Sequence, residues 1–399
     1  MRVKKENHRS LDEMSQRKSR WNFLAKDALG LILTFSGKIE LVRSQRVCKS
    51  WSLPAVALDR FWVLHYIRDW EERVPEHKSR NMCRQLYRER QLTYWNWLTG
   101  KCRMHTISFE DPDDPVIHVS NGLVHRIVVG RKSGRVQMWN TQVQEMTHET
   151  VFKSACQYLA VSENKVAVLH DNQLHRLSAI NLDSIHRVPL SGRILDIVFM
   201  DGILVVRRLD TNLLVEYDNK KMDDIPQSST WQCVQVCRYR RTLYAIEYSH
   251  PDCNLIEYHF DTRVCERTLL TVSRVQFLRV SRHVLYIVSP EEGGLVLMLQ
   301  IPEMRLLQII PLYAPHLSNC FYCPHMLVVL GSKKVGMNSS IVIVPRGIAV
   351  RLEPHEPFSG PVIGDVSPTC LYQLSHDKQR MFIYDFAEST SSFSSCCVS

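Results

Sequence analysis

The spacing of apolar residues divides the chain into two parts with different periods. Near residues 42–70, apolar side chains recur three and four positions apart, as in Val47, Cys48 and Trp51, which is the period of a helix with one buried face. From about residue 115 onward this period disappears, and short apolar runs separated by turn residues take its place. The pattern predicts a small helical region followed by a long all-β region.

The β region repeats at about 40 residues. Seven apolar runs, each followed by a turn and a second strand-like run, are separated by 42, 38, 39, 42, 43 and 43 residues when one residue in each serves as a marker. The markers are Val124, Val166, Leu204, Leu243, Leu285, Val328 and Leu371. Four-stranded units at this spacing, without helices between them, are typical of β-propeller blades. We therefore expect a seven-bladed propeller over residues 102–388. It resembles WD-repeat propellers in spacing, although only Trp139-Asn140 approximates their Trp-Asp pair.

The two ends of this β region are expected to meet. The last unit supplies only three strands before a Ser/Cys-rich tail at 389–399. Residues 103–109, RMHTISF, alternate as a strand does and precede the first full unit. We predict that they form the outer strand of the last blade and so close the ring.

Charge is concentrated in the N-terminal quarter. Residues 1–101 carry 21 Lys and Arg against 11 Asp and Glu, whereas the other 298 residues carry 29 against 30. The basic residues are interleaved with acidic ones at helical spacing, which favours a solvated helix face over a nucleic-acid site. No nucleic-acid partner is expected. Residues 1–20 read as a basic flexible tail.

The opening residues contain no signal-peptide core, and no apolar run reaches the roughly 18 residues that span a bilayer. These features predict a cytoplasmic or nuclear protein. The 13 cysteines have no repeated spacing and are expected to be reduced.

Residues 21–65 resemble an F-box. An apolar helix through Leu29, Ile32 and Leu33 is followed by the element Arg46-Val47-Cys48-Lys49-Ser50-Trp51, with Phe61-Trp62 about ten residues later. Ala25 stands where the family usually has proline. Residues 66–101 resemble the helical linker of F-box/WD-repeat proteins, with Tyr87, Arg88, Arg90, Asn96, Trp97 and Gly100 in the positions of its motif.

This resemblance implies a multidomain α plus all-β fold and a substrate-recognition subunit of a cullin-RING (SCF-type) ubiquitin ligase. The F-box would bind the ligase adaptor and, through it, a cullin, while the propeller would bind the protein to be ubiquitinated. Three short helices cannot bury all of their apolar residues internally, which favours a partner on their surface. The expected adaptor-binding residues are Leu24, Ala25, Leu29, Ile32, Leu33, Leu41, Val47, Cys48 and Trp51.

Arginines near the ends of the inner strands are candidates for binding an acidic or phosphorylated substrate, because a guanidinium holds phosphate through two hydrogen bonds. They are Arg193, Arg207, Arg208, Arg238, Arg240, Arg241, Arg274 and Arg282. No catalytic constellation, cofactor or metal site is expected. The pair Cys320 and Cys323 has half the spacing of a zinc site but is expected to be packed in the core, and Cys233 and Cys237 are expected to share one strand face.

The last four residues, Cys396-Cys397-Val398-Ser399, fit a prenylation signal at Cys396, although no polybasic stretch lies beside it. One lipid chain would give only weak membrane association. Two other functions stay open at this point: an interaction scaffold whose degenerate F-box binds no adaptor, for which Ala25 argues, and a nucleic-acid-binding protein that uses the basic N-terminal quarter. An enzyme with its active site in the propeller is the least favoured alternative.

Overall fold

A computed structural model shows the chain as two compact units, residues 1–91 and 92–399. The structure describes residues 62–67, 70, 83–109, 111–123, 125–162, 165–190, 192–200, 203–208, 213–217, 220–225, 228, 230–249, 252–313, 316–323, 326–332, 339–343, 348–352, 364–367, 369–375, 377–387 and 394–395. Within these residues, no helix has both the length and the apolar character needed to cross a membrane.

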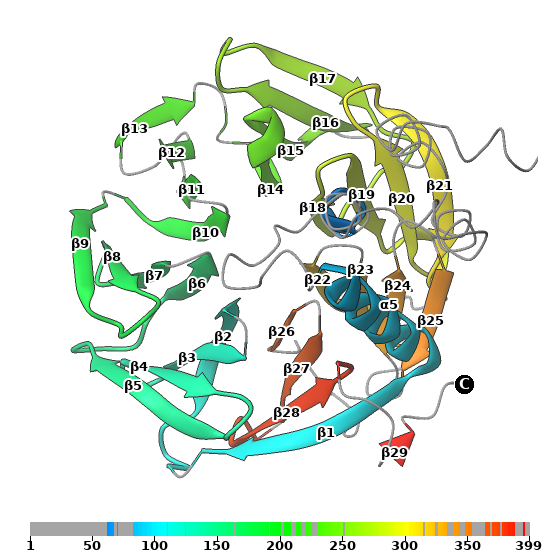
Figure 1. Ribbon diagram of the computed structural model, residues 1–399. Coiled ribbons are helices and arrows are strands. Elements are labelled where there is room, and N and C mark those ends of the chain that lie inside the picture. The colour runs from blue at the N-terminus through cyan, green and yellow to red at the C-terminus, as the bar shows by residue number, and fades with distance from the viewer. Residues whose placement is uncertain are drawn as a thin grey trace, which may run out of the picture. The chain divides into compact units, whose positions relative to one another are not determined.

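The second unit is a ring of β-sheets (Figure 1). Six sheets are antiparallel meanders of four consecutive strands, and we number them as blades 1 to 6 along the chain. Blade 1 contains β2 (Val116–Leu123), β3 (Arg126–Arg131), β4 (Arg135–Asn140) and β5 (Glu145–Val151). Blade 2 contains β6 (Tyr158–Ser162), β7 (Lys165–His170), β8 (Gln173–Ser178) and β9 (Ser184–Pro189). Blade 3 contains β10 (Ile194–Met200), β11 (Ile203–Arg208), β12 (Leu213–Tyr217) and β13 (Lys220–Ile225).

The chain continues around the ring in the same way. Blade 4 contains β14 (Trp231–Cys237), β15 (Thr242–Ser249), β16 (Asp252–His259) and β17 (Cys265–Leu269). Blade 5 contains β18 (Phe277–Val280), β19 (Val284–Ser289), β20 (Leu295–Gln300) and β21 (Arg305–Pro311). Blade 6 contains β22 (His316–Cys323), β23 (Met326–Ser332), β24 (Ser339–Ile343) and β25 (Ile348–Leu352). Two 3-10 turns, η4 (Arg238–Arg240) and η5 (Glu291–Gly293), lie between strands of blades 4 and 5.

The last sheet is composite and closes the ring. Its strands are β26 (Gly364–Val366), β27 (Cys370–Leu374), β28 (Arg380–Asp385), then β1 (Lys101–Ser108) and β29 (Ser394–Ser395). The strand expected at 103–109 therefore lies at β1, which pairs antiparallel with β28 from Arg103 opposite Asp385 to Ser108 opposite Arg380. The first strands of neighbouring sheets are in contact in the cyclic order β2, β6, β10, β14, β18, β22, β26 and back to β2.

The burial of each strand follows its place in its blade. The second strands, such as β7 and β19, are buried on both faces, because neighbouring blades cover them. Their apolar residues form separate clusters between successive blades, for example the cluster of Tyr286, Val288 and Leu327 between blades 5 and 6. The fourth strands β9 and β17 are almost wholly exposed. This graded burial explains why the second strands carried the repeat signal.

The expected fold class needs two corrections. Only six sheets are regular four-stranded blades, because the seventh is assembled from both ends of the β region and has five strands. The described residues also contain almost no α-helix: besides the two 3-10 turns, only residues 62–67, residue 70 and α5 (Cys83–Thr99) are helical. The expected count of seven was wrong because it included this composite sheet as a blade, since its strands β26, β27 and β28 follow one another at the normal interval. Residues 21–61 of the expected F-box lie outside the described residues.

The last turn of α5 is held by the composite sheet. Trp97 is fully buried and stacks on Phe386, with ring centroids 3.7 Å apart and an interplanar angle of 16°. Asn96 Nδ2 donates a 2.8 Å hydrogen bond to the carbonyl oxygen of Phe386. Gly100 follows the helix with φ of 65°, a left-handed conformation that suits glycine after a helix. In the first unit, Trp62 lies 5.2 Å from Tyr87 between ring centroids.

Candidate functional site

Two of the predicted sites fall outside the described residues. These are the whole adaptor-binding set, from Leu24 to Trp51, and the prenylation site at Cys396. The cysteine pair lies on β22, where Cys320 is fully buried and burial raises the pKa of its thiol to about 11. A neutral thiol is a poor metal ligand, because metals bind the thiolate. Cys237 and Cys233 both pack into the cluster between blades 4 and 5.

The predicted arginines lie on two opposite faces of the ring. An even number of antiparallel strands returns the chain to the face where the blade began, so every blade starts on the same face. Arg193, Arg207, Arg208 and Arg274 lie at that starting face, before first strands or at the end of a second strand. Arg238, Arg240, Arg241 and Arg282 lie at the opposite face, in the turns that join first and second strands of blades 4 and 5.

The second group forms a basic turn, which we define as residues 238–241 together with Arg282. Arg240 crosses to blade 5, where its Nη2 donates a 2.9 Å hydrogen bond to the carbonyl oxygen of Ile301. The Arg282 guanidinium carbon lies 4.9 Å above the centre of the Tyr239 ring. Arg241 Nε lies 3.0 Å from Asp261 Oδ1, and both side chains are more than half exposed. The turn thus presents guanidinium groups on the surface of adjacent blades.

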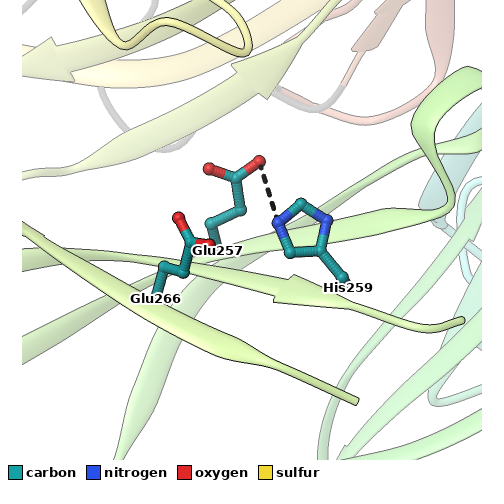
Figure 2. Close-up of side chains that lie close together, drawn as sticks. All are labelled: Glu257, His259 and Glu266. Atoms are coloured by element: carbon teal, nitrogen blue, oxygen red, sulfur yellow. Dashed lines mark ion pairs between the residues drawn. The ribbon is translucent and has the colours of Figure 1, made fainter. Parts of the chain in front are cut away.

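Glu257, His259 and Glu266 converge on two neighbouring strands of blade 4 (Figure 2). One ligand-type atom from each residue lies within 4.8 Å of the other two. The strand register produces this arrangement, because Glu257 on β16 lies opposite Glu266 on β17 and His259 is two residues further along β16, on the same face. His259 Nε2 is 3.7 Å from Glu257 Oε1.

Two side chains of the neighbouring strand β15 make hydrogen bonds to Glu257 and His259. Tyr244, opposite Glu257 in the register, donates a 3.0 Å hydrogen bond from its hydroxyl to Glu257 Oε1. Thr242 Oγ1 lies 3.1 Å from His259 Nδ1. Burial raises the pKa of the Glu257 carboxyl above its ordinary value, while the Tyr244 hydrogen bond and the charges of His259 and Arg240 oppose that rise.

A second polar group lies on the innermost strands, around the centre of the ring. Asp365 of β26 accepts a 2.5 Å hydrogen bond from the backbone N–H of Asn121 on β2. Burial raises the pKa of the Asp365 carboxyl to about 6, against the effect of this hydrogen bond and of the Arg279 charge. Arg279 of β18 donates from Nη2 to the carbonyl oxygen of Cys320 on β22. These groups join first strands of neighbouring sheets.

Sequence reasoning missed both polar groups. A signal was present for the first, because Glu-x-His on one strand followed by Glu seven residues later is the spacing of a short hairpin with all three side chains on one face. Nothing in the sequence marked Asp365, whose partner Asn121 is 244 residues away.

The architecture defines a β-propeller protein, and the comparison with one solved β-propeller domain agrees. The chain is similar to the β-propeller domain of Cps50 (Swd1) from Myceliophteria thermophila, with a TM-score of 0.53, 10% identity, and coverage of 71% of this chain and 99% of that chain. It also matches BamB from Moraxella catarrhalis, with a TM-score of 0.44, 14% identity, and coverage of 67% and 84%. At this identity the likeness to Cps50 shows the fold alone. No family model and no curated protein matches the chain.

Proposed function

We propose that this β-propeller is a protein-interaction module that works as the substrate-recognition subunit of a cullin-RING ubiquitin ligase. The interaction role is supported by the fold, whose turns project from a closed ring, and by the exposed arginines of the basic turn. The ligase role is supported by the F-box resemblance of residues 21–65 and by the linker motif. The protein would act by holding a substrate lysine near a ubiquitin thioester, which raises its effective concentration.

The observation that carries the proposal is the linker motif in its structural setting. Asn96 and Trp97, two of its residues, are 3% and 0% exposed and lock the end of α5 to the composite sheet. Residues that resemble the linker motif of F-box/WD-repeat proteins therefore lie where α5 ends against the composite sheet, which supports the proposal. Gly100, the last residue of the motif, follows the helix with φ of 65° and lets the chain turn from α5 into β1.

Asp261 illustrates how the basic turn would hold an acidic substrate. Its carboxylate already lies 3.0 Å from Arg241 Nε, in an ion pair that is exposed to water on both sides. Exposed pairs of this kind contribute at most about 1 kcal/mol, so a phosphate or a peptide carboxylate can displace Asp261. We propose an acidic or phosphorylated protein segment as the substrate class.

Co-purification tests the ligase role. The full chain is expressed together with the ligase adaptor, alongside the variants Leu33→Ala and Trp51→Ala and the control Trp95→Ala, whose side chain is 57% exposed on α5. We expect the wild type and the control to retain the adaptor and the two F-box variants to lose it. A wild-type chain that retains no adaptor at micromolar concentration refutes the ligase role. That result favours a scaffold with a degenerate F-box, as the alanine at position 25 suggests.

A further inference from the structure

We propose that Glu257, His259 and Glu266 form a binding site for a divalent transition-metal ion, with Zn²⁺ as the best match. Two carboxylates and one imidazole are a donor set that Zn²⁺ accepts, with water as the fourth ligand. The site goes beyond the proposed function, because neither adaptor nor substrate recognition requires a metal.

The hydrogen bonds around His259 fix which ring nitrogen is available. Thr242 Oγ1 donates its proton to the carbonyl oxygen of Arg240 at 3.0 Å, so it accepts a hydrogen bond from His259 Nδ1–H at 3.1 Å. The remaining nitrogen, Nε2, then carries a lone pair directed toward Glu257. Metal-binding histidines are commonly oriented in this way, by a hydrogen bond from the other ring nitrogen.

The Glu257 carboxylate is also oriented by a hydrogen bond from a neighbouring side chain. Its side chain is almost fully buried, and Tyr244 orients the carboxylate through the hydrogen bond to Oε1. The separation of 3.7 Å between Glu257 Oε1 and His259 Nε2 is too long for a hydrogen bond but close to the distance of about 3.4 Å between two ligand atoms of a tetrahedral zinc ion. The pair therefore needs little movement to accept a metal.

Glu266 supplies the third ligand and the missing charge balance. Glu266 lies directly opposite Glu257 in the strand register, and a divalent cation between the two carboxylates would offset the repulsion of their charges. The ligand atoms of the three residues lie within 4.8 Å of one another. Glu266 is exposed, so its side chain can rotate and bring its carboxylate closer to the other two ligand atoms. Arg240, the nearby cation, directs Nη2 away toward Ile301.

Metal binding to the full-length chain tests the proposal. The protein is stripped with a chelator, dialysed against micromolar Zn²⁺ and measured for bound zinc, together with titration by Co²⁺ followed through its visible absorption. The variants are His259→Ala and Glu266→Gln, and the control is His186→Ala, an exposed histidine on β9. Glu266→Gln removes a charge from an exposed side chain, so the fold is expected to survive.

We expect both site variants to bind Zn²⁺ at least tenfold more weakly than the wild type and to lose one metal equivalent under these conditions, while His186→Ala keeps it. The Co²⁺ spectrum of the wild type should show an imidazole and oxygen environment that disappears in His259→Ala. The proposal is overturned if the stripped wild type takes up no metal, or if folded Glu266→Gln and His259→Ala bind as well as the control.

Discussion

Phe386 receives two different contacts from the end of α5: its ring stacks on Trp97, and its carbonyl oxygen accepts a hydrogen bond from Asn96, which lies 290 residues away in the chain. Phe386 follows β28 directly, and β28 pairs with β1, the strand that begins after α5. The helix end and the closing strand are therefore anchored to the same short segment. Contacts at this place connect the helix end to the strand pair that closes the ring.

Trp97→Ala tests this anchoring. Because the Trp97 side chain is fully buried, we expect the variant to lower the free energy of unfolding of the propeller by about 3 to 5 kcal/mol. The matched control is Trp95→Ala in the same helix, which removes a side chain that is 57% exposed and should cost less than about 1 kcal/mol. Chemical denaturation of the full chain measures both, and equal losses would contradict the structure.

Gly134 and Gly293 form a second matched pair. Both have positive φ, of 96° and 85°, but a Cβ atom at Gly134 would lie 2.4 Å from the carbonyl oxygen of Ser154, whereas one at Gly293 meets nothing within 4 Å. Gly134→Ala must displace backbone and is expected to lower the free energy of unfolding by more than about 2 kcal/mol. Gly293→Ala should cost about 1 kcal/mol, from backbone strain alone. Thermal and denaturant unfolding compare the two.

Asp365 gives the ring a defined pH dependence. Its folded pKa of about 6 is above the ordinary value of 3.8, so the native state binds the proton more tightly than the unfolded chain. The stabilisation from this group is complete below about pH 4 and is lost as the pH rises through 6. We expect Asp365→Asn to remove about 2 to 3 kcal/mol of this dependence between pH 4 and 7.

The measurement is the difference in unfolding free energy between the wild type and Asp365→Asn at each pH, because other carboxyls titrate in the same range. Glu247, for example, has a pKa lowered by its hydrogen bond to Arg267 and acts in the opposite direction. A difference that stays constant from pH 4 to 7 would show that Asp365 titrates normally.

Charge reversal at the basic turn tests the proposed substrate class. Arg241→Glu and Arg282→Glu should weaken the binding of acidic or phosphorylated peptides to the full chain at least tenfold. Each change replaces a positive guanidinium with a carboxylate that repels the negative peptide. Arg193→Glu, on the opposite face of the ring, is the control. Fluorescence anisotropy against a panel of phosphorylated peptides measures the effect. Binding that is lost only in the Arg193 variant would move the substrate site to the other face.

The β architecture was largely readable from the sequence, because the second strands are covered on both sides and repeat as apolar runs. The closing strand was also predictable, since RMHTISF alternates and one strand of the last unit was missing. The side-chain clusters were not predictable to the same degree. Asp365 meets Asn121 only because the ring closes, and no local pattern records a contact over 244 residues. The arginines were grouped only by their closeness to the ends of inner strands, whereas the alternating direction of antiparallel strands separates them into two faces.

The pairing of β1 with β28 also sets the order of events during synthesis. Strand β1 is synthesised before any of the blades. Its partner strand β28 leaves the ribosome only after all six regular blades have been made. At ordinary elongation rates this interval is on the order of tens of seconds, during which two unpaired strand edges are open to aggregation. Nascent chains stalled before residue 380 should therefore depend on chaperones far more than chains released after residue 387.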